Sequence, residues 1–245
     1  MAMTVVYEVK GGLYINLTNR CPCSCKFCIR TNGEGAYGSD PLWLEREPTR
    51  QEVINAIETA NPLSYSEIVF CGYGEPTERL DDLVAVAKYL KTKYPSLPIR
   101  LNTNGLSDLI AGEPTAQRFK GVIDTISISL NASTAEAYCE MCRPRFGLKS
   151  YEAMLSFTSQ VRQFVPEVVM SIVATSDTPE TEIAACSDIC NNLGVSLRVR
   201  TYISSADRIS PSSVFCVNSF CSTAITTILL FFISYRDFSY RGGCC

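Results

Sequence analysis

The sequence predicts an α/β protein built on a parallel sheet. Short runs rich in β-branched residues alternate with amphipathic helical runs, and this alternation continues to about residue 203. Of the 245 residues, 46% are hydrophobic and 19% are charged, the balance of an ordinary globular protein with one large domain or two small ones. Strands that alternate with helices imply right-handed crossovers between parallel strands, in a sheet that is either open or rolled into a barrel.

Six short segments have the composition and period of strands. In chain order they are residues 13–17, 67–71, 98–103, 124–130, 168–175 and 195–202. Helical patterns separate most of them, so we expect consecutive strands to lie parallel to one another.

The first predicted helix carries a start signal. Thr49 and Glu52 have the spacing of a capping box, in which the hydroxyl and the carboxylate each accept a backbone hydrogen bond. Val53, Ile54 and Ile57 follow at helical spacing and mark the face that we expect to be buried.

Later helices carry similar signals. Ser133 and Glu136 repeat the capping-box spacing, and Thr178 is placed to cap a helix whose first residue is Pro179. Two further helices are marked by apolar residues at helical spacing: Leu80, Leu83, Val84, Ala87 and Leu90 for one, and Met154, Leu155, Val161 and Val165 for the other.

The alternation stops near residue 203. Residues 204–213 are polar, and an apolar, cysteine-bearing stretch follows that ends in Gly-Gly-Cys-Cys. We therefore expect residues 1–203 to form the folded domain and residues 204–245 to form an atypical, poorly ordered C-terminal tail. A docked helix that closes the barrel is the alternative for this tail.

Composition excludes several classes of function. The chain has no histidine, which removes Ser-His-Asp and Cys-His catalysis and histidine metal sites. Its net charge of −3 lacks the basic excess of a protein that coats nucleic acid. Residues 223–234 form an apolar run of about a dozen residues, shorter than the roughly 20 that span a bilayer as a helix, so no membrane partner is expected.

Thirteen cysteines are too few for a small disulfide scaffold and many for an ordinary domain of this length. The first residues contain no basic segment followed by an apolar run, so no secretory signal is expected. We therefore predict a cytoplasmic protein, in which clustered cysteines serve a metal or catalysis.

The strongest motif follows the first predicted strand. Cys21, Cys25 and Cys28 have the spacing C-x3-C-x2-C, with an additional Cys23 between them. Three thiolates are one too few for a closed zinc site or for an iron–sulfur cube held by protein alone, so they leave one coordination position open. Two alternatives remain: Cys23 is the fourth ligand of a structural zinc site, or the thiols are buried and incidental.

Three other predicted strands also end in polar or glycine-rich motifs. They are Cys71-Gly-Tyr-Gly-Glu-Pro76, Asn102-Thr-Asn-Gly105, and Ser127, Ser129 and Asn131 on one face of their strand. Each alone is weak, since an Asn-Gly pair is usually a turn and such serines usually cap or pack. In a parallel sheet, however, the carboxyl ends of all strands lie at one edge, so these segments and the cysteine loop are predicted to share one site.

Together, these motifs resemble the radical SAM superfamily. The resemblance rests on the C-x3-C-x2-C run with Phe27 before its last cysteine, on Gly-Glu-Pro and on Thr-Asn-Gly, and it covers roughly residues 10–203. The wording FCGYGEPT and the length are similar to the TatD-associated radical SAM proteins. The resemblance implies an α/β fold with a partial (β/α)6 TIM-type barrel of parallel strands, open on one side.

The resemblance also implies a role for each motif. Cys21, Cys25 and Cys28 would hold a [4Fe–4S] cluster whose open iron binds the amino and carboxylate groups of S-adenosylmethionine. The implied cofactor contacts are Phe27 near the adenine, Tyr73, Gly74, Glu75 and Pro76 at the methionine amino end, and Thr103, Asn104, Ser129 and Asn131 at the ribose and methionyl group. Arg143, beyond the fourth predicted strand, is a candidate partner of the carboxylate because a guanidinium matches a carboxylate bidentately, and a plain surface arginine is the alternative. Tyr73 departs from the family's Gly-Gly-Glu-Pro pattern, which has glycine there.

The implied activity is that of a radical S-adenosylmethionine enzyme. An electron from a flavodoxin- or ferredoxin-like donor would cleave the sulfonium bond, and the resulting 5′-deoxyadenosyl radical would abstract hydrogen from a substrate that the sequence does not identify. A barrel open on one side suits a macromolecular substrate, although no basic strip supports nucleic acid. The alternative from a different class is a non-catalytic zinc- or iron–sulfur-binding module.

Two further cysteine pairs raise the question of a second cluster. Cys139 and Cys142, and Cys186 and Cys190, have spacings that a second cluster could use. Cys186 and Cys190, however, fall on a helical stripe with apolar neighbours, where a free thiol packs like a small hydrophobic side chain. This packing argues against a second cluster, and the sequence alone does not decide whether one exists.

Overall fold

A computed structural model describes residues 3–31 and 39–201 of the chain. The segment that the sequence predicts to be a poorly ordered tail, residues 204–245, lies outside the described residues. Among the described residues, no helix is both long enough and apolar enough to cross a membrane.

One seven-stranded sheet forms the frame, with its strands in sequence order from β1 to β7. The strands are β1 Val6–Val9, β2 Gly12–Ile15, β3 Ile68–Phe70, β4 Ile99–Thr103, β5 Thr125–Ser129, β6 Glu167–Ala174 and β7 Ser196–Thr201. From β2 to β7 all neighbours are parallel, and β1 pairs antiparallel with β2. In the described part of the chain β1 and β7 do not pair, so the sheet is an open, partial barrel and the predicted fold class is confirmed.

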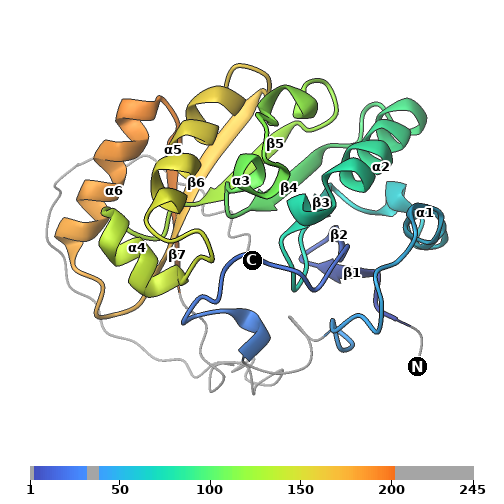
Figure 1. The fold of residues 1–245 in the computed structure, drawn as a ribbon. Helices are drawn as coiled ribbons and strands as arrows, with labels where there is room; N and C mark the ends of the chain where they lie inside the picture. Colours follow the sequence, from blue (N-terminus) through green and yellow to red (C-terminus); the bar gives the residue numbers. More distant parts are fainter. Residues whose placement is uncertain (1–2, 32–38, 202–245) are drawn as a thin grey trace, which may run out of the picture.

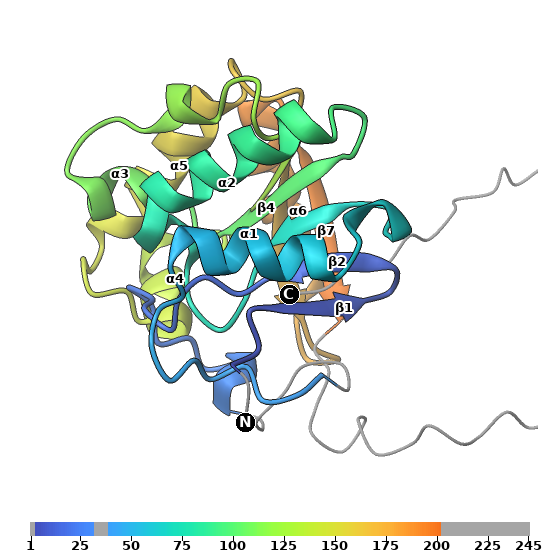
Figure 2. The same ribbon diagram turned by 90° about the vertical axis from the view of Figure 1, so that its right-hand side faces the viewer.

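Helices line one side of this curved sheet, as Figures 1 and 2 show. The α-helices are α1 Arg50–Thr59, α2 Leu80–Lys93, α3 Ser107–Ala111, α4 Ala135–Cys142, α5 Lys149–Val161 and α6 Glu180–Leu193. Short 3-10 helices are η1 Ile29–Thr31, η2 Pro62–Ser64, η3 Pro76–Arg79 and η4 Ala116–Phe119. Right-handed crossovers place successive helices on the same side of a barrel-like sheet.

The main core lies between the helices and the sheet. Alternate strand residues point toward the helices because successive side chains of a strand face opposite sides. Leu13, Ile68, Leu101 and Ile126 are among these and are almost fully buried. Helices contribute Val53, Ile57, Leu83, Leu90, Met154 and Phe157 to the same core.

The opposite, concave face of the sheet is more polar. Asn102 on β4 lies beside Ser127 on β5, and Ser129 lies beside Ser171 on β6. Arg100 is also buried on this face, where it donates to the Glu67 carboxylate at 2.7 Å. The sheet therefore presents hydrogen-bonding groups to the inside of the partial barrel.

The N-terminal hairpin was not predicted. β1 and β2 are joined by Lys10 and Gly11, which both have positive φ, at 49° and 79°. Two such residues match the twist of a tight hairpin turn, and glycine adopts this conformation readily. The alternation analysis missed β1 because a four-residue strand shows too few repeats for its period to be recognised.

Two of the three predicted helix caps are wrong. The capping box at Thr49 and Glu52 is confirmed. At α4 the N-cap is Thr134, because Ser133 instead donates its backbone N–H and its hydroxyl to Glu182 of α6, each at 2.7 Å. At α6 Pro179 is the N-cap position, and the Thr178 hydroxyl accepts from the backbone of Thr175 at 2.9 Å.

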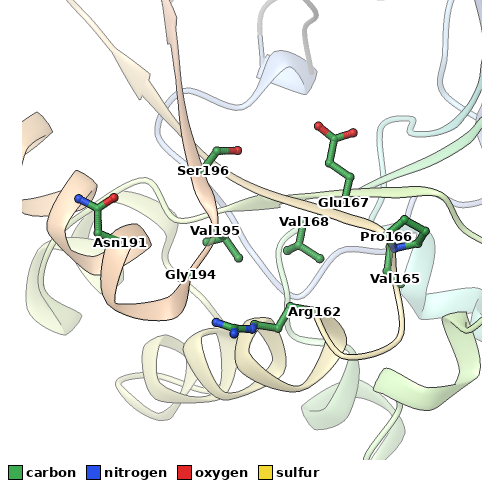
Figure 3. Close-up of a pocket in the computed structure, with 9 residues that line it drawn as sticks. All are labelled: Arg162, Val165, Pro166, Glu167, Val168, Asn191, Gly194, Val195 and Ser196. Carbon is green, nitrogen blue, oxygen red and sulfur yellow. The ribbon is translucent and has the colours of Figure 1, made fainter.

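A pocket of about 640 Å³ opens where β6 and β7 begin (Figure 3). It is lined by Arg162, Val165, Pro166, Glu167, Val168, Asn191, Gly194, Val195 and Ser196. The Arg162 guanidinium donates to the carbonyl of Leu193 at the end of α6. This pocket is at the amino ends of the strands, the opposite end from the predicted motifs, and contains none of them.

Candidate functional site

The carboxyl ends of β2, β3 and β4 bring the predicted motifs into contact. The backbone N–H of Glu75, after β3, donates to the carbonyl of Arg20 in the loop after β2 at 2.8 Å. Thr103, the last residue of β4, donates its hydroxyl to Glu75 at 2.7 Å. Asn104 lies within 3.8 Å of the Cys23 sulfur. The cysteine loop and the motifs after β3 and β4 therefore lie at one edge of the sheet, as predicted.

The cysteine loop is held in place by the end of α4. Ser24 donates its backbone N–H to the carbonyl of Cys142 at 3.0 Å, and Lys26 donates to Met141 at 2.9 Å. On the surface, Lys26 also pairs with Glu140 at 2.6 Å. Backbone hydrogen bonds on both sides of Cys25 thus fix this part of the loop against the helix.

Within the loop, the thiols contact one another. Cys23 is buried and hydrogen-bonds to the sulfur atoms of Cys21 and Cys25. These bonds, together with burial, raise the pKa of Cys23 well above its usual range. The bond from Cys23 lowers the pKa of Cys21 below its usual value, so the two neighbouring thiols shift in opposite directions.

Cys25 has a second thiol neighbour that sequence analysis did not place at the site. Hydrogen bonds from Cys142 and Cys23 lower the pKa of Cys25 to about 4. Cys142 ends α4, and Tyr138, one turn earlier, is almost fully buried near Cys23. The usable signal in the sequence was the i, i+4 spacing of Tyr138 and Cys142 on the helix that follows β5.

Cys28 faces a different partner. Arg30 donates its Nε–H to the Cys28 sulfur at 3.3 Å and a second N–H to the carbonyl of Cys23 at 3.2 Å. Its guanidinium also lies over the ring of Trp43, 6.0 Å from the centroid. Arg30 therefore brings a fixed positive charge to the cysteine loop.

Glu75 joins two strand ends through a buried carboxylate. Oε1 accepts from the hydroxyls of Thr77 and Thr103 at 2.8 and 2.7 Å, and Oε2 accepts from the backbone N–H of Asn104 at 2.7 Å. Burial raises the pKa of Glu75 above its usual value, while the bonds from Asn104 and the two threonines oppose this rise. Both oxygens of the Glu75 carboxylate are thus bonded to other residues of the protein, and these bonds position Thr103 and Asn104.

Two glycines allow the loop after β3 to approach the loop after β2. A Cβ at Gly72 would lie 2.2 Å from Oδ1 of Asn16, and one at Gly74 would lie 2.2 Å from the carbonyl oxygen of Thr18. Real side chains do not tolerate such distances, so only glycine fits at either position. Asn16 is itself buried and accepts from the backbone N–H of Tyr73 at 3.3 Å.

Tyr73 and Phe27 have apolar surroundings. The Tyr73 ring is buried against Leu42 and meets the ring of Trp43 edge-on at 5.2 Å. This contact gives a physical reason for tyrosine at a position where the resembling family has glycine. Phe27 is half-buried and packs against the edge of the main core. Pro76, the neighbouring motif residue, is buried and begins η3.

The predicted residues at the end of β5 and beyond it lie in different environments. Ser129 is half-buried on the concave face. Asn131 is buried, has φ 61° and donates to the Cys142 sulfur at 3.5 Å, and its Oδ1 has no hydrogen-bond partner among the described residues. Arg143 is exposed at the C-terminal end of α4. Asn131 therefore lies beside the cysteine cluster, whereas Arg143 lies at its periphery.

The donor chemistry of this loop suits an iron–sulfur cluster. Cys21, Cys25 and Cys28 are half-buried on one short loop, and two of them are biased toward the thiolate that binds iron. In residues 3–31 and 39–201, no three cysteine or acidic side chains are gathered around one metal position. The thiols instead bond to one another and to Arg30.

Comparison with known sequences identifies the family. The sequence pattern of the Radical SAM superfamily matches residues 15–184. GTP 3′,8-cyclase from Corynebacterium glutamicum strain R is 30% identical over 199 residues, covering 78% of this chain and 48% of the cyclase. The same figures hold for the GTP 3′,8-cyclase of strain ATCC 13032. The chain thus spans about half the length of the curated relatives that it matches.

Solved structures share the fold at low sequence identity. SuiB of Streptococcus suis bound to the precursor peptide SuiA has a TM-score of 0.59 at 14% identity, covering 81% of this chain and 40% of SuiB. The structure of anSMEcpe with bound AdoMet and the Kp18Cys peptide has a TM-score of 0.57 at 14% identity, covering 78% and 51%. Methylornithine synthase (PylB) has a TM-score of 0.53 at 15% identity, covering 79% and 53%.

Replacing Gly74 tests the close approach of the two loops. Gly74→Ala places a methyl group against the carbonyls of Thr18 and Arg20, so we expect the free energy of unfolding to fall by about 3 kcal/mol. The matched control is Gly112→Ala, where a Cβ meets nothing within 4 Å and only the positive φ opposes alanine. That change should cost about 1 kcal/mol. Denaturant unfolding measures both, and equal losses would contradict the steric argument.

The buried carboxylate of Glu75 predicts a pH dependence of stability. Because the folded-state pKa is raised above 4.5, its favourable contribution is complete below pH 4.5 and is lost as the pH rises through the folded value. The native chain should therefore lose stability relative to Glu75→Gln between pH 4 and pH 7: its free energy of unfolding, minus that of the variant, should fall over this range. Denaturant titrations of both proteins at several pH values measure this difference. If the free energy of unfolding of the native chain instead rose with pH relative to that of Glu75→Gln, the fold would stabilise the charged carboxylate and the prediction would be wrong.

Proposed function

The chain belongs to the radical SAM superfamily, and we propose that it is a radical S-adenosylmethionine enzyme whose [4Fe–4S] cluster is held by Cys21, Cys25 and Cys28. The observation that carries this proposal is the meeting of the cysteine loop, the Gly74–Glu75 turn and Asn104 at one edge of the sheet. Members of the superfamily bind this cluster and S-adenosylmethionine. When bound, the two supply a one-electron cleavage that yields a 5′-deoxyadenosyl radical.

The chain's own residues would position the nucleotide. Gly74 allows the loop after β3 to lie directly against the carbonyls of Thr18 and Arg20, which places the Glu75 segment beside the cysteine loop. The Glu75 carboxylate fixes the end of β4, and with it Asn104. Groups fixed before the ligand binds lose little entropy on binding, which is how an enzyme holds a reactive bond in one geometry.

Other residues of the site would supply specific contacts. We assign Phe27 to the adenine ring, Tyr73, Gly74, Glu75 and Pro76 to the methionine amino end, and Thr103, Asn104, Ser129 and Asn131 to the ribose and methionyl group. Thr103 and Glu75 would act largely through the bonds they make to their own chain. Arg143, exposed at the end of α4, is the proposed partner of the methionine carboxylate.

The wording FCGYGEPT supports placing the chain among the TatD-associated radical SAM proteins. An enzyme of this class needs an electron donor, for which we propose a flavodoxin- or ferredoxin-like protein. The partial barrel is open between β1 and β7 in the described residues, which suits a large substrate. SuiB, with a similar fold, is bound to a precursor peptide. We propose the cytoplasm as the compartment, because clustered free thiols persist in reducing conditions.

Anaerobic reconstitution tests the proposed activity. The native chain is loaded with iron and sulfide, reduced chemically in the presence of S-adenosylmethionine, and assayed by chromatography for 5′-deoxyadenosine. We expect 5′-deoxyadenosine from the native chain and none from Cys25→Ala, since loss of a ligand removes the cluster. A chain that takes up zinc, builds no cluster and leaves S-adenosylmethionine intact would instead support the non-catalytic binding module.

Cys23 is the matched control because it lies in the same loop. The three-ligand proposal predicts that Cys23→Ala retains iron and sulfide at the native level and still forms 5′-deoxyadenosine. A four-thiolate site predicts loss of the metal from the same variant. Iron and sulfide content, measured beside absorbance of the reconstituted protein, separates the two outcomes without relying on turnover.

A further inference from the structure

Cys142 is the one described thiol outside the C-x3-C-x2-C loop region that contacts the sulfur of a proposed cluster ligand. It lies at the end of α4, and its thiol hydrogen-bonds to the sulfur of Cys25. Cys142 is almost completely buried, with 1% of its surface exposed, whereas Cys25 is half-buried. Two thiols from elements far apart in the sequence thus lie in direct contact.

The backbone holds these two residues together independently of their sulfur atoms. Ser24 and Lys26, on either side of Cys25, donate to the carbonyls of Cys142 and Met141 at 3.0 and 2.9 Å. On the far side, Asn131 donates to the Cys142 sulfur at 3.5 Å, which fixes the direction of that side chain. A disulfide requires closely approaching Cβ atoms, and these backbone hydrogen bonds on both sides of Cys25 place it next to Cys142.

Two other buried free thiols in the described part of the chain have different surroundings. Cys186 and Cys190 lie buried on α6, on the apolar stripe that the sequence predicted. The Cys186 thiol donates to Glu182 of its own helix at 3.9 Å. These two thiols act as small core side chains, as expected of buried free cysteine. Cys142 is equally buried, but it lies against the cysteine loop of residues 21–28.

We propose that Cys25 and Cys142 form a reversible disulfide when the cluster-free chain meets peroxide. The proposal rests on the proposed function only in treating Cys25 as a cluster ligand. The disulfide would withdraw that ligand from metal binding and shield its sulfur from irreversible oxidation, until a dithiol reductant restores both thiols.

The reaction balances with hydrogen peroxide as the oxidant. The Cys25 sulfur attacks the peroxide, the O–O bond breaks, and Cys25 becomes a sulfenic acid as the first water leaves. The Cys142 sulfur then attacks the Cys25 sulfur, the S–S bond forms, and the sulfenic oxygen leaves as the second water. Two thiols lose two electrons and two protons, and one peroxide becomes two waters. The less buried sulfur meets the oxidant, and the buried one completes the bond.

Cys23 is the competing partner, because its thiol also contacts Cys25. It is shared with Cys21, however, and lies only two residues from Cys25, so its disulfide would close a tight ring within the loop. The contact with Cys142 joins two elements whose backbones are already pinned to each other. The geometry therefore favours Cys142.

Peptide mapping of the oxidised chain tests the proposal. The full chain is stripped of metal, reduced, desalted and treated with equimolar hydrogen peroxide, and free thiols are then alkylated under denaturing conditions. Mass spectrometry of the unreduced tryptic digest should find the peptide of residues 21–26 linked to the peptide that contains Cys142. Treatment with dithiothreitol should remove this link.

Three alanine variants locate the bond. Cys142→Ala should abolish the link, while Cys139→Ala, which changes a half-buried thiol on the same peptide, should retain it. Cys23→Ala should retain it as well. A link that survives in Cys142→Ala, a disulfide confined to residues 21–26, or an unlinked Cys25 oxidised to sulfinic acid would each overturn the proposal.

The result is independent of catalysis. Peroxide mapping uses neither iron nor S-adenosylmethionine, so a chain that forms the Cys25–Cys142 link but builds no cluster would refute the proposed function alone. A chain that produces 5′-deoxyadenosine but shows no link would refute this inference alone. Denaturant unfolding of all three alanine variants verifies that a lost link reflects the missing thiol in a folded protein.

Discussion

The buried carboxylate of Glu75 is the interaction on which the geometry of the site depends. It is placed where β3 has ended, and it accepts hydrogen bonds from Thr77 in its own loop and from Thr103 and Asn104 at the end of β4. Such a group is costly to bury unless its oxygens are satisfied, so the two strand ends are held in one arrangement. Because the backbone N–H of Glu75 also binds Arg20, this constraint extends to the cysteine loop.

The cysteine loop shows how one short segment can prepare thiols for different roles. Cys21 and Cys25 accept hydrogen bonds from neighbouring thiols, which favours their thiolate forms, while Cys23 donates and stays protonated. Cys28 is approached by the Arg30 guanidinium. The surroundings of these thiols therefore differ in hydrogen bonding and burial, although all four lie within eight residues of one another.

Local signals predicted much of this architecture, and long-range contacts explain what was missed. The alternation of strands and helices and the capping box at Thr49 depend on neighbours in the sequence, and both were predicted correctly. Ser133 was mistaken for a cap because its true partner, Glu182, is on a distant helix. The grouping of motifs followed from parallel topology, but the approach of Cys142 to Cys25 depends on how α4 docks against the loop, which no local pattern encodes.

The two faces of the sheet have different functions: one packs against the helices, and the other lines the inside of the partial barrel. Residues such as Leu101 and Ile126 face the helices and supply apolar packing, while Asn102 and Ser127, the next residue along each strand, face the concave side. Substitutions on the concave face would alter what the barrel holds and leave the helix-packed core intact. Strands of this kind allow evolution to change the ligand chemistry of the barrel one residue at a time, without rebuilding the framework that keeps the protein folded.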